Sequence, residues 1–287
     1  MVPMDVKAFE NALRTENRAR LYFRKRCWKN GRIFCTRCQS KTVYRITGKR
    51  YRCKRCRYTF HDFTGRWINK VRIAYKTWLW VLKLFELEVS ARQVAQQTRL
   101  SYPTALKAYD MLRYAIIDTA EDAQELLSGE IELDESYFGG RRKGKRGRGA
   151  GHKVPVFGIL ERNGVVKVSV VKNVTAAALL NMTIKTVRRG SIVYTDKFRS
   201  YDSLMFCGYR HMRVDHGKRF ANGKVYINGL EGFWSYAKER LIKFHGVSQN
   251  KFPLYLKEME FRYNNRQHDD LFELLTQKLC HLVSNLL

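Results

Sequence analysis

Two pairs of cysteines place the tightest constraint on how this chain of 287 residues can fold. Two residues separate Cys35 from Cys38 and likewise Cys53 from Cys56, and 14 residues lie between the pairs. Four thiolates in two such short loops complete a tetrahedral shell around Zn²⁺ and leave no open position for a reactant. Between the pairs, a VYRIT run, a glycine and a YRC run predict two short strands joined by a turn. We therefore expect a zinc ribbon with a structural Zn²⁺ over residues 31–72.

The chain also carries a large excess of positive charge, with a formal net charge of +29 at pH 7. The first 72 residues alone contain 21 Lys and Arg against 4 Asp and Glu. Such a surplus repels itself unless a polyanion binds, so nucleic acid is the first candidate partner, and the motifs described below imply double-stranded DNA. The apolar run from Trp78 to Val89 contains charged residues and is shorter than the roughly 18 residues of a membrane span. Because the N-terminus is too polar for a signal peptide, we expect a cytoplasmic protein that binds no membrane.

Helical patterns follow the ribbon. Two segments with helical spacing are joined by a short turn, and a serine and a proline stand where helices commonly begin. The pattern indicates a helix-turn-helix whose second helix would present Tyr102, Thr104 and Lys107 to a DNA groove. Helical hairpins of this size also serve as packing devices, so the pattern alone leaves both interpretations open.

The sequence changes to strands after residue 128. Four short runs rich in Val, Ile and Leu, with a helical stretch after the third, predict a mixed α/β sheet. The expected organisation is a helical segment (1–30), the zinc ribbon (31–72), a helix-turn-helix DNA-binding region (73–128) and an α/β catalytic domain with C-terminal helices (129–287).

Three carboxylates in separate parts of the α/β region carry the strongest functional signal. Asp134 and Asp196 end runs that are typical of buried strands, and Glu231 lies near the start of an amphipathic helix. A carboxylate in such a strand costs desolvation energy and needs compensation, which a metal ion can supply. Two strand aspartates and a helix glutamate form an oxygen cage suited to Mg²⁺, with Mn²⁺ able to substitute. Two such ions can drive in-line displacement at a phosphate.

Other side chains are expected beside these acids. Lys238 lies nearly two helical turns after Glu231 on the same flank, where it can touch a DNA phosphate, and Asn228 can also reach the site. A glycine-rich polycationic loop next to the strand of Asp134 is expected to grip DNA through Arg141, Arg142, Lys143, Lys145, Arg146, Arg148 and Lys153. Taken singly, Asp196 is better explained as a helix cap, Glu231 as a first-turn acid favoured by the helix dipole, and Lys238 as a solvated charge. The order of the three acids as strand, strand and helix, together with the basic loop, favours a catalytic site.

The motifs IELDESYFGG, VYTDKFRSYDSL and INGLEGFWSYAKERL resemble those of the DDE transposases of bacterial insertion sequences and their Merlin relatives. The resemblance covers most of the chain, because the ribbon and helices at the front also occur in these enzymes. It implies a ribonuclease-H-like catalytic core in which Asp134, Asp196 and Glu231 bind the metal ions, with Lys238 and Asn228 as companions. A Gly-Leu pair precedes the glutamate where the relatives often have Gly-Ile, which is a conservative difference.

The function that this resemblance implies is binding of the element's terminal inverted repeats, cleavage of the ends and joining of the 3′-hydroxyls to target DNA. Two ends must be held together, so we expect a homodimer or larger homo-oligomer, associated with the nucleoid of a prokaryotic cell. Two other interpretations stay open. One is a ribonuclease-H-like nuclease or resolvase that cuts without joining. The other is a non-catalytic DNA-binding regulator, which would explain the charge but not the three acids.

Overall fold

The computed structural model describes residues 4–120, 125–139, 153–172, 174–196, 205, 207–213, 227–244 and 246–283. The chain divides into two compact units. The first comprises Met1–Ala120 together with His268–Leu287, and the second comprises Glu121–Gln267. The second unit therefore ends earlier than the expected α/β domain, which extended to the last residue.

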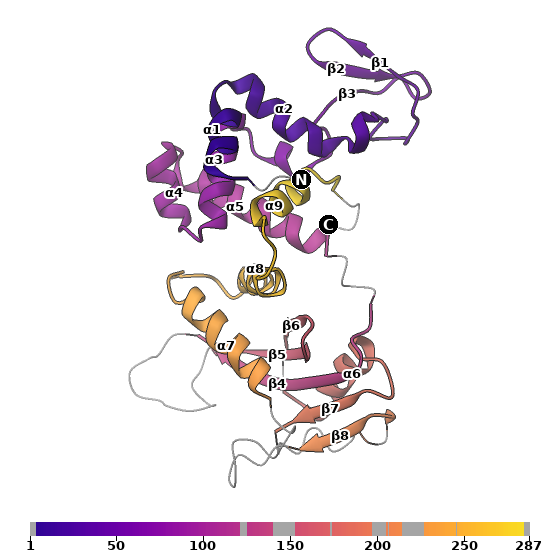
Figure 1. Cartoon of the computed structure of the whole chain (residues 1–287), viewed down its shortest axis with the longest axis vertical. Helices are drawn as coiled ribbons and strands as arrows, with labels where there is room; N and C mark the ends of the chain where they lie inside the picture. Colours follow the sequence, from indigo (N-terminus) through magenta and orange to yellow (C-terminus); the bar gives the residue numbers. More distant parts are fainter. Residues whose placement is uncertain are drawn as a thin grey trace. The chain divides into compact units, whose positions relative to one another are not determined.

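Helices form most of the first unit (Figure 1). Their bounds are α1 (Val6–Leu13), α2 (Glu16–Cys27), α3 (Tyr75–Glu86), α4 (Ala91–Thr98), α5 (Tyr102–Asp118) and α9 (Leu271–Leu279), with short 3₁₀ turns η1 (Lys29–Gly31) and η2 (Trp67–Lys70). Most of these α-helices begin where a side-chain oxygen accepts a hydrogen bond from the first turn, as Asp5, Thr15, Ser90, Ser101 and Asp270 do. Across the described ranges, no helix combines the length and the apolar character required to span a membrane.

Helix α9 belongs to the first unit because of the contacts that its two sides make. Phe272 and Leu279 are buried on its inner side. On its flank, the Glu273 carboxylate accepts hydrogen bonds of 3.0 and 3.1 Å from Nε of Arg26 and of 3.1 Å from the Tyr22 hydroxyl, both in α2. An amphipathic stripe predicts that a helix is covered but not which unit covers it, so the sequence grouped α9 with the α/β region.

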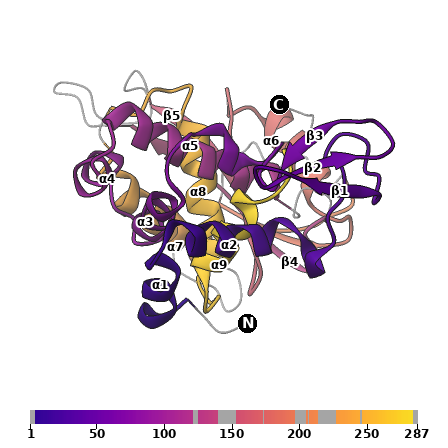
Figure 2. The same ribbon diagram turned by 90° about the horizontal axis from the view of Figure 1, so that it is seen from above.

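The ribbon is an antiparallel sheet of three strands, β1 (Val43–Ile46), β2 (Arg50–Cys53) and β3 (Thr59–His61), one more than the sequence predicted. The buried Asp62, just after β3, joins the ribbon to α2 and the residue that follows it. Its carboxylate accepts hydrogen bonds from Nε1 of Trp28 (2.8 Å), the Tyr51 hydroxyl (3.0 Å) and Nε of Arg24 (3.2 Å), and it pairs with Arg20. Figure 2 shows the ribbon strands and α4 at opposite ends of this unit.

The second unit contains a five-stranded mixed sheet in the order β6-β5-β4-β7-β8. The strands are β4 (Glu130–Phe138), β5 (Val154–Glu161), β6 (Val166–Val170), β7 (Ile192–Thr195) and β8 (Arg210–Arg213). Strand β5 runs antiparallel to both β4 and β6, whereas β7 and β8 are parallel to β4. This order with these directions is that of a ribonuclease-H-like core, which confirms the fold class predicted from the sequence.

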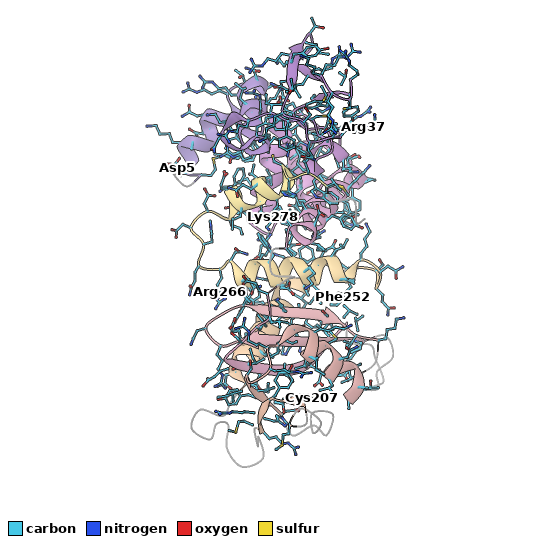
Figure 3. All side chains as sticks on the ribbon, turned by 90° about the vertical axis from the view of Figure 1, so that its right-hand side faces the viewer. Asp5, Arg37, Cys207, Phe252, Arg266 and Lys278 are labelled. Atoms are coloured by element: carbon cyan, nitrogen blue, oxygen red, sulfur yellow. The ribbon has the colours of Figure 1, made fainter. Side chains whose placement is uncertain are left out.

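Helices cover both faces of this sheet. On one face Leu179 of α6 (Ala176–Thr186) joins a core with Ile131 and Leu133 of β4. The opposite face carries a second core beneath α7 (Asn228–Leu241) and α8 (Phe252–Asn264), and Figure 3 shows α8 lying along the sheet. Side chains alternate along β4, so Glu132 and Asp134 point to the α7 face. The sequence predicted that Asp134 faces away from the core, but the second core partly buries it.

The outer edge of the sheet, β6, is bonded to side chains of α8. The Val166 backbone donates a hydrogen bond of 2.8 Å to Oδ1 of Asn264, and its carbonyl accepts one of 2.9 Å from Nδ2 of the same amide. Two residues along, the Val168 N–H donates to Oε2 of Glu260 at 2.7 Å. These bonds hold α8 against the edge of the sheet. Helices α7 and α8 together cover the second core.

Candidate active site and metal centre

Asp134 and Asp196 come from neighbouring parallel strands. Tyr194 of β7 pairs with Glu132 of β4, and β7 ends one residue later. Continuing this register by two residues sets Asp196 beside Asp134, at the point where β7 stops and the chain leaves the sheet. Asp134 itself lies inside β4, which continues past it to Phe138, rather than at the strand end that the sequence predicted.

Glu231 approaches the same place from above the sheet, on the first turn of α7. The side chains of Leu230, Phe233 and Trp234 are buried against the sheet and set the rotation of the helix. The pKa of Asp134 is raised to about 6, chiefly by burial, with smaller upward contributions from the negative charges of Asp196 and Glu231. The charges of Asp196 and Glu231 therefore reach Asp134, which places the three predicted acids in the same part of the second unit.

The Asp134 carboxylate is held by a residue that the sequence assigned only to packing. Nε1 of Trp234, one helical turn after Glu231, donates a hydrogen bond of 2.9 Å to Oδ2 of Asp134. Gly158 is the partner of Asp134 on β5, and a Cβ there would lie 2.6 Å from the Trp234 ring. Glycine at this position therefore leaves the space that the indole needs. The spacing of the tryptophan from the glutamate was the available signal, but it also fits an ordinary core residue.

Basic groups flank the acids. Lys238, one turn after Trp234, is exposed, and its Nζ lies 5.7 Å from the centroid of the Phe138 ring. Partial burial lowers the pKa of Lys238, the charge of Lys153 lowers it further, and the charge of Asp134 opposes both effects. Asn228 is exposed at the first position of α7. The other predicted basic residues, Arg141, Arg142, Lys143, Lys145, Arg146 and Arg148, lie outside the described residues.

The four ribbon cysteines form a compact cluster. Their Sγ atoms all lie within 4.8 Å of one another, with 3.6 Å between Cys35 and Cys56 and between Cys38 and Cys53. A tetrahedral shell with Zn–S bonds of about 2.3 Å requires S–S distances of about 3.8 Å. Gln39 and Arg57 follow the two cysteine pairs, and each has a left-handed φ of 60°, so both loops turn back in the same way. The cluster therefore fits one Zn²⁺ ion with no open coordination position.

Helices α4 and α5 form the predicted pair with a tight turn between them. Arg99 adopts a left-handed φ of 56° at the end of α4, and Ser101 caps α5 by accepting the backbone N–H of Thr104. Tyr102 is 48% exposed and Lys107 is also exposed. Thr104 is half-buried, and its hydroxyl lies 2.8 Å from that of Ser101, so part of its hydrogen-bonding capacity is used by the cap.

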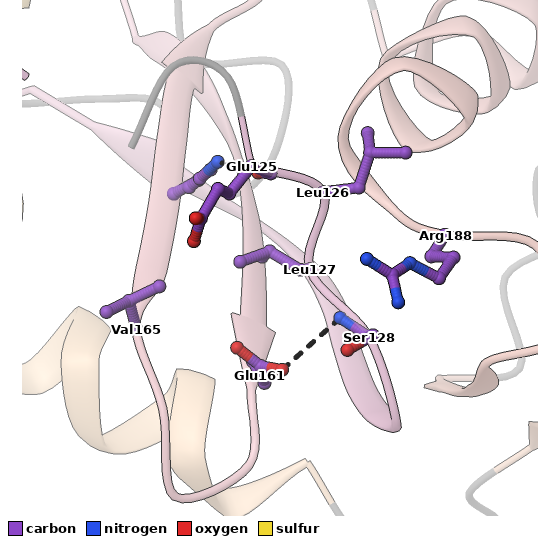
Figure 4. A pocket seen from close by; sticks show the side chains of 8 residues that line it. Glu125, Leu126, Leu127, Ser128, Glu161, Val165 and Arg188 are labelled. Atoms are coloured by element: carbon purple, nitrogen blue, oxygen red, sulfur yellow. Dashed lines mark hydrogen bonds between the residues drawn. The ribbon is translucent and has the colours of Figure 1, made fainter. Parts of the chain in front are cut away.

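A hollow of about 610 Å³ lies elsewhere in the second unit, around the start of β4 (Figure 4). Leu127, Val165 and Arg188 contribute to its wall, and the Ser128 backbone donates a hydrogen bond of 3.3 Å to the Glu161 carboxylate. None of the three acids lines it. We therefore define the candidate active site by the acids and not by this hollow.

Comparison with known proteins gives two family matches and several relatives. Residues 126–264 match the ISXO2-like transposase domain, and residues 14–59 match the transposase zinc-ribbon domain. An uncharacterized transposase-like protein of Haemophilus influenzae is 45% identical over 108 residues, which is 38% of this chain and 88% of that protein. An uncharacterized protein in transposable element ISH50 of Halobacterium salinarum is 30% identical over 258 residues, 82% of this chain and 86% of that protein. The Mos1 strand transfer complex is 14% identical, covering 69% of this chain and 73% of that one, with a TM-score of 0.33.

The matched regions and the fold define the class of protein. A transposase zinc ribbon ahead of a ribonuclease-H-like unit that matches a transposase domain places this chain among the DDE-type transposases. It belongs to the ISXO2-like transposase family, which confirms the resemblance seen in its motifs.

Proposed function

We propose that this transposase binds the terminal inverted repeats of its own insertion sequence, cleaves the ends and joins the 3′-hydroxyls to target DNA. The observation that supports this proposal is the raised pKa of the Asp134 carboxyl, to which the charges of Asp196 and Glu231 contribute from the end of β7 and from α7. A largely buried carboxylate with two further acids near it is unfavourable unless a cation compensates the negative charge. Their oxygen atoms suit Mg²⁺ or Mn²⁺ better than softer metals.

In this proposal the three acids hold two Mg²⁺ ions, which when bound supply activation of the attacking oxygen and stabilisation of the leaving oxygen. The protein's own part is to place those acids and the DNA strand. Trp234 fixes the orientation of the Asp134 carboxylate through its hydrogen bond. Lys238 and Lys153 offer positive charge to a phosphate next to the acids, and Asn228 contacts the DNA strand from the start of α7.

DNA binding is proposed to involve both units. Helix α5 would present Tyr102, Thr104 and Lys107 to a groove, while the basic loop before β5 would grip the backbone near the acids. The ribbon offers a further surface, since Tyr44 and Arg52 pair across β1 and β2 and are both exposed. We further propose that two or more copies hold the two ends, and that the protein works at the nucleoid of a prokaryotic cell.

The test is an assay of labelled end DNA with purified protein, Mg²⁺ and a target plasmid. The wild-type protein should cut the ends and join them, whereas Asp134→Ala, Asp196→Ala and Glu231→Ala should bind the ends and produce neither product. Glu161→Gln, which changes a carboxylate of the same unit outside the site, is the control and should keep both activities.

The products also separate the alternatives. Cleaved ends without joined products from the wild-type protein would favour a nuclease or resolvase, and binding without metal-dependent cleavage would favour a regulator. An Asp196→Ala variant that still joins ends would show that the metal-binding assignment is wrong.

A further inference from the structure

Glu132 is a buried carboxylate two residues before Asp134 on the same face of β4. Only 1% of its surface is exposed. A charge in that position requires specific partners, because burial without them would be strongly unfavourable. Its two partners are the start of α7 and Arg162, and each of them either lies close in sequence to one of the proposed metal-binding acids or contacts a residue that does.

The first partner is the start of α7. Oε2 of Glu132 accepts a hydrogen bond of 2.9 Å from the backbone N–H of Leu230, and the N–H of Gly229 bonds to the same carboxylate. A negative charge at a helix N-terminus is favourable, because unpaired N–H groups point toward it. A Cβ at Gly229 would lie 2.8 Å from Oε2, so glycine permits this close approach. The contact fixes the turn that carries Glu231.

The second partner is Arg162, just beyond β5. Its Nε donates to Oε1 of Glu132 at 3.1 Å, and its Nη1 donates to Glu130 at 2.9 Å. The guanidinium carbon lies 3.7 Å from the centroid of the Tyr194 ring, a stacked cation–π contact. Tyr194 lies on β7 two residues before Asp196, which follows the strand, and Glu132 lies two residues before Asp134 on β4.

We propose that Glu132, through Leu230 and Arg162, is the positioning residue that fixes the spacing of Asp134, Asp196 and Glu231 for divalent-metal binding. This inference rests on the proposed function, because it concerns the same three acids. The side chain of Glu132 itself binds the helix and the arginine rather than metal or DNA. Replacing Glu132 should therefore weaken metal binding, although the three acids themselves are not mutated.

The experiment measures Mn²⁺ binding to the full, zinc-loaded chain by calorimetry. The Asp134→Asn variant shows how much Mn²⁺ binds elsewhere on the protein. Glu132→Gln keeps the size of the side chain and removes the charge opposite Arg162. We expect it to bind Mn²⁺ about 10-fold more weakly than the wild type, as loss of an outer partner of a metal site commonly does. In the end-cleavage assay, the Mn²⁺ concentration for half-maximal rate should rise while the rate at saturating Mn²⁺ stays close to the wild-type rate.

Glu161→Gln is the matched control, because Glu161 also accepts a backbone N–H from another segment but lies outside the network. It should bind Mn²⁺ as the wild type does. A folded Glu132→Gln protein with wild-type Mn²⁺ affinity would overturn the inference, since a purely structural role changes stability and not the affinity of the folded site.

A second variant covers the case in which Glu132→Gln fails to fold. Gly229→Ala retains both charges and inserts a methyl group between the carboxylate and α7, so it should also weaken Mn²⁺ binding. Wild-type affinity in folded Gly229→Ala would contradict the proposal. If the wild type and Asp134→Asn bind Mn²⁺ equally, the acids are not a metal site, and the proposed function fails together with this inference. That outcome is distinct from a defect confined to the Glu132 and Gly229 variants.

Discussion

The indole of Trp234 donates a hydrogen bond of 2.9 Å to the carboxylate of Asp134, and so joins α7 directly to β4. The donor lies three residues after Glu231, and the acceptor is one of the three proposed metal ligands. A hydrogen bond to the charged form lowers a carboxyl pKa, yet burial outweighs it and raises the pKa of Asp134 to about 6. The site is therefore ordered before any cation arrives, at a cost in stability.

Replacing Asp134 by Asn should stabilise the metal-free protein at pH 8 and not at pH 3.5. The folded-state pKa of about 6 lies above the ordinary value of 3.8, so the folded protein loses stability relative to the unfolded chain as pH rises from about 4 to 6. Asn removes this loss and still accepts the Trp234 hydrogen bond. The gain at pH 8 is at most about 3 kcal/mol, to be measured by urea unfolding of chelator-treated protein. A gain of the same size at both pH values would contradict the assignment.

Replacing Gly158 by Ala should destabilise the second unit, because the added Cβ would lie 2.6 Å from the Trp234 ring. Overpacking of this kind costs about 1–3 kcal/mol and would also move the indole away from Asp134. Gly232→Ala is the control, since a Cβ there meets nothing within 4 Å and alanine favours the helix by roughly 0.5–1 kcal/mol. Urea unfolding should show a lower free energy of unfolding for Gly158→Ala and a higher one for Gly232→Ala. Equal changes in the two variants would argue against the steric explanation.

Replacing Cys53 by Ser should release the zinc ion and unfold the ribbon, since a site of four thiolates supplies much of the folding energy of so small a sheet. We expect the metal content to fall from one zinc per chain to none, as measured by elemental analysis, and limited proteolysis to cut within residues 31–72. Cys207→Ser removes a thiol outside the cluster and should retain the metal. Zinc retention by the Cys53 variant would contradict the four-cysteine site.

If Lys107 contacts a phosphate, replacing it by Ala should weaken binding to end DNA. The slope of the logarithm of the binding constant against the logarithm of the salt concentration should become smaller by about one. The measurement is a titration of labelled end DNA at several salt concentrations. Lys76→Ala removes another exposed lysine of the same unit, on α3, and serves as the control. Identical salt slopes for the two variants would remove α5 from the proposed DNA-binding surface.

Features set by local spacing could be predicted from the sequence. The two cysteine pairs gave the ribbon, and the alternation of apolar residues gave the strands that carry Asp134 and Asp196. The start of α7 at Asn228 followed from its amphipathic pattern. The run IELDESYF predicted the strand of Asp134 as a whole, but its buried part was expected to end at Asp134, because polar residues interrupt the apolar pattern there. In the fold it extends to Phe138, where pairing with β5 from Val154 onward maintains it.

Features that depend on distant partners could not be predicted. The sequence shows Glu132 and Arg162 as unrelated charges, and only the pairing of β4 with β5 brings them within 3.1 Å of each other. The same holds for Trp234, whose pattern identifies a buried side chain without identifying an acceptor for its N–H. Non-local hydrogen bonds leave no spacing signal in a single chain.

The bonds from Asn264 and Glu260 to the outer backbone of β6 have a consequence for assembly. An unprotected edge strand invites a strand from another molecule, which is a common route to uncontrolled association. Here an incoming strand would first have to displace an amide and a carboxylate that already satisfy Val166 and Val168. Copies of this transposase that meet on DNA are therefore expected to join through surfaces other than this rim of the sheet, so that neighbouring molecules stay separable when they crowd onto one element.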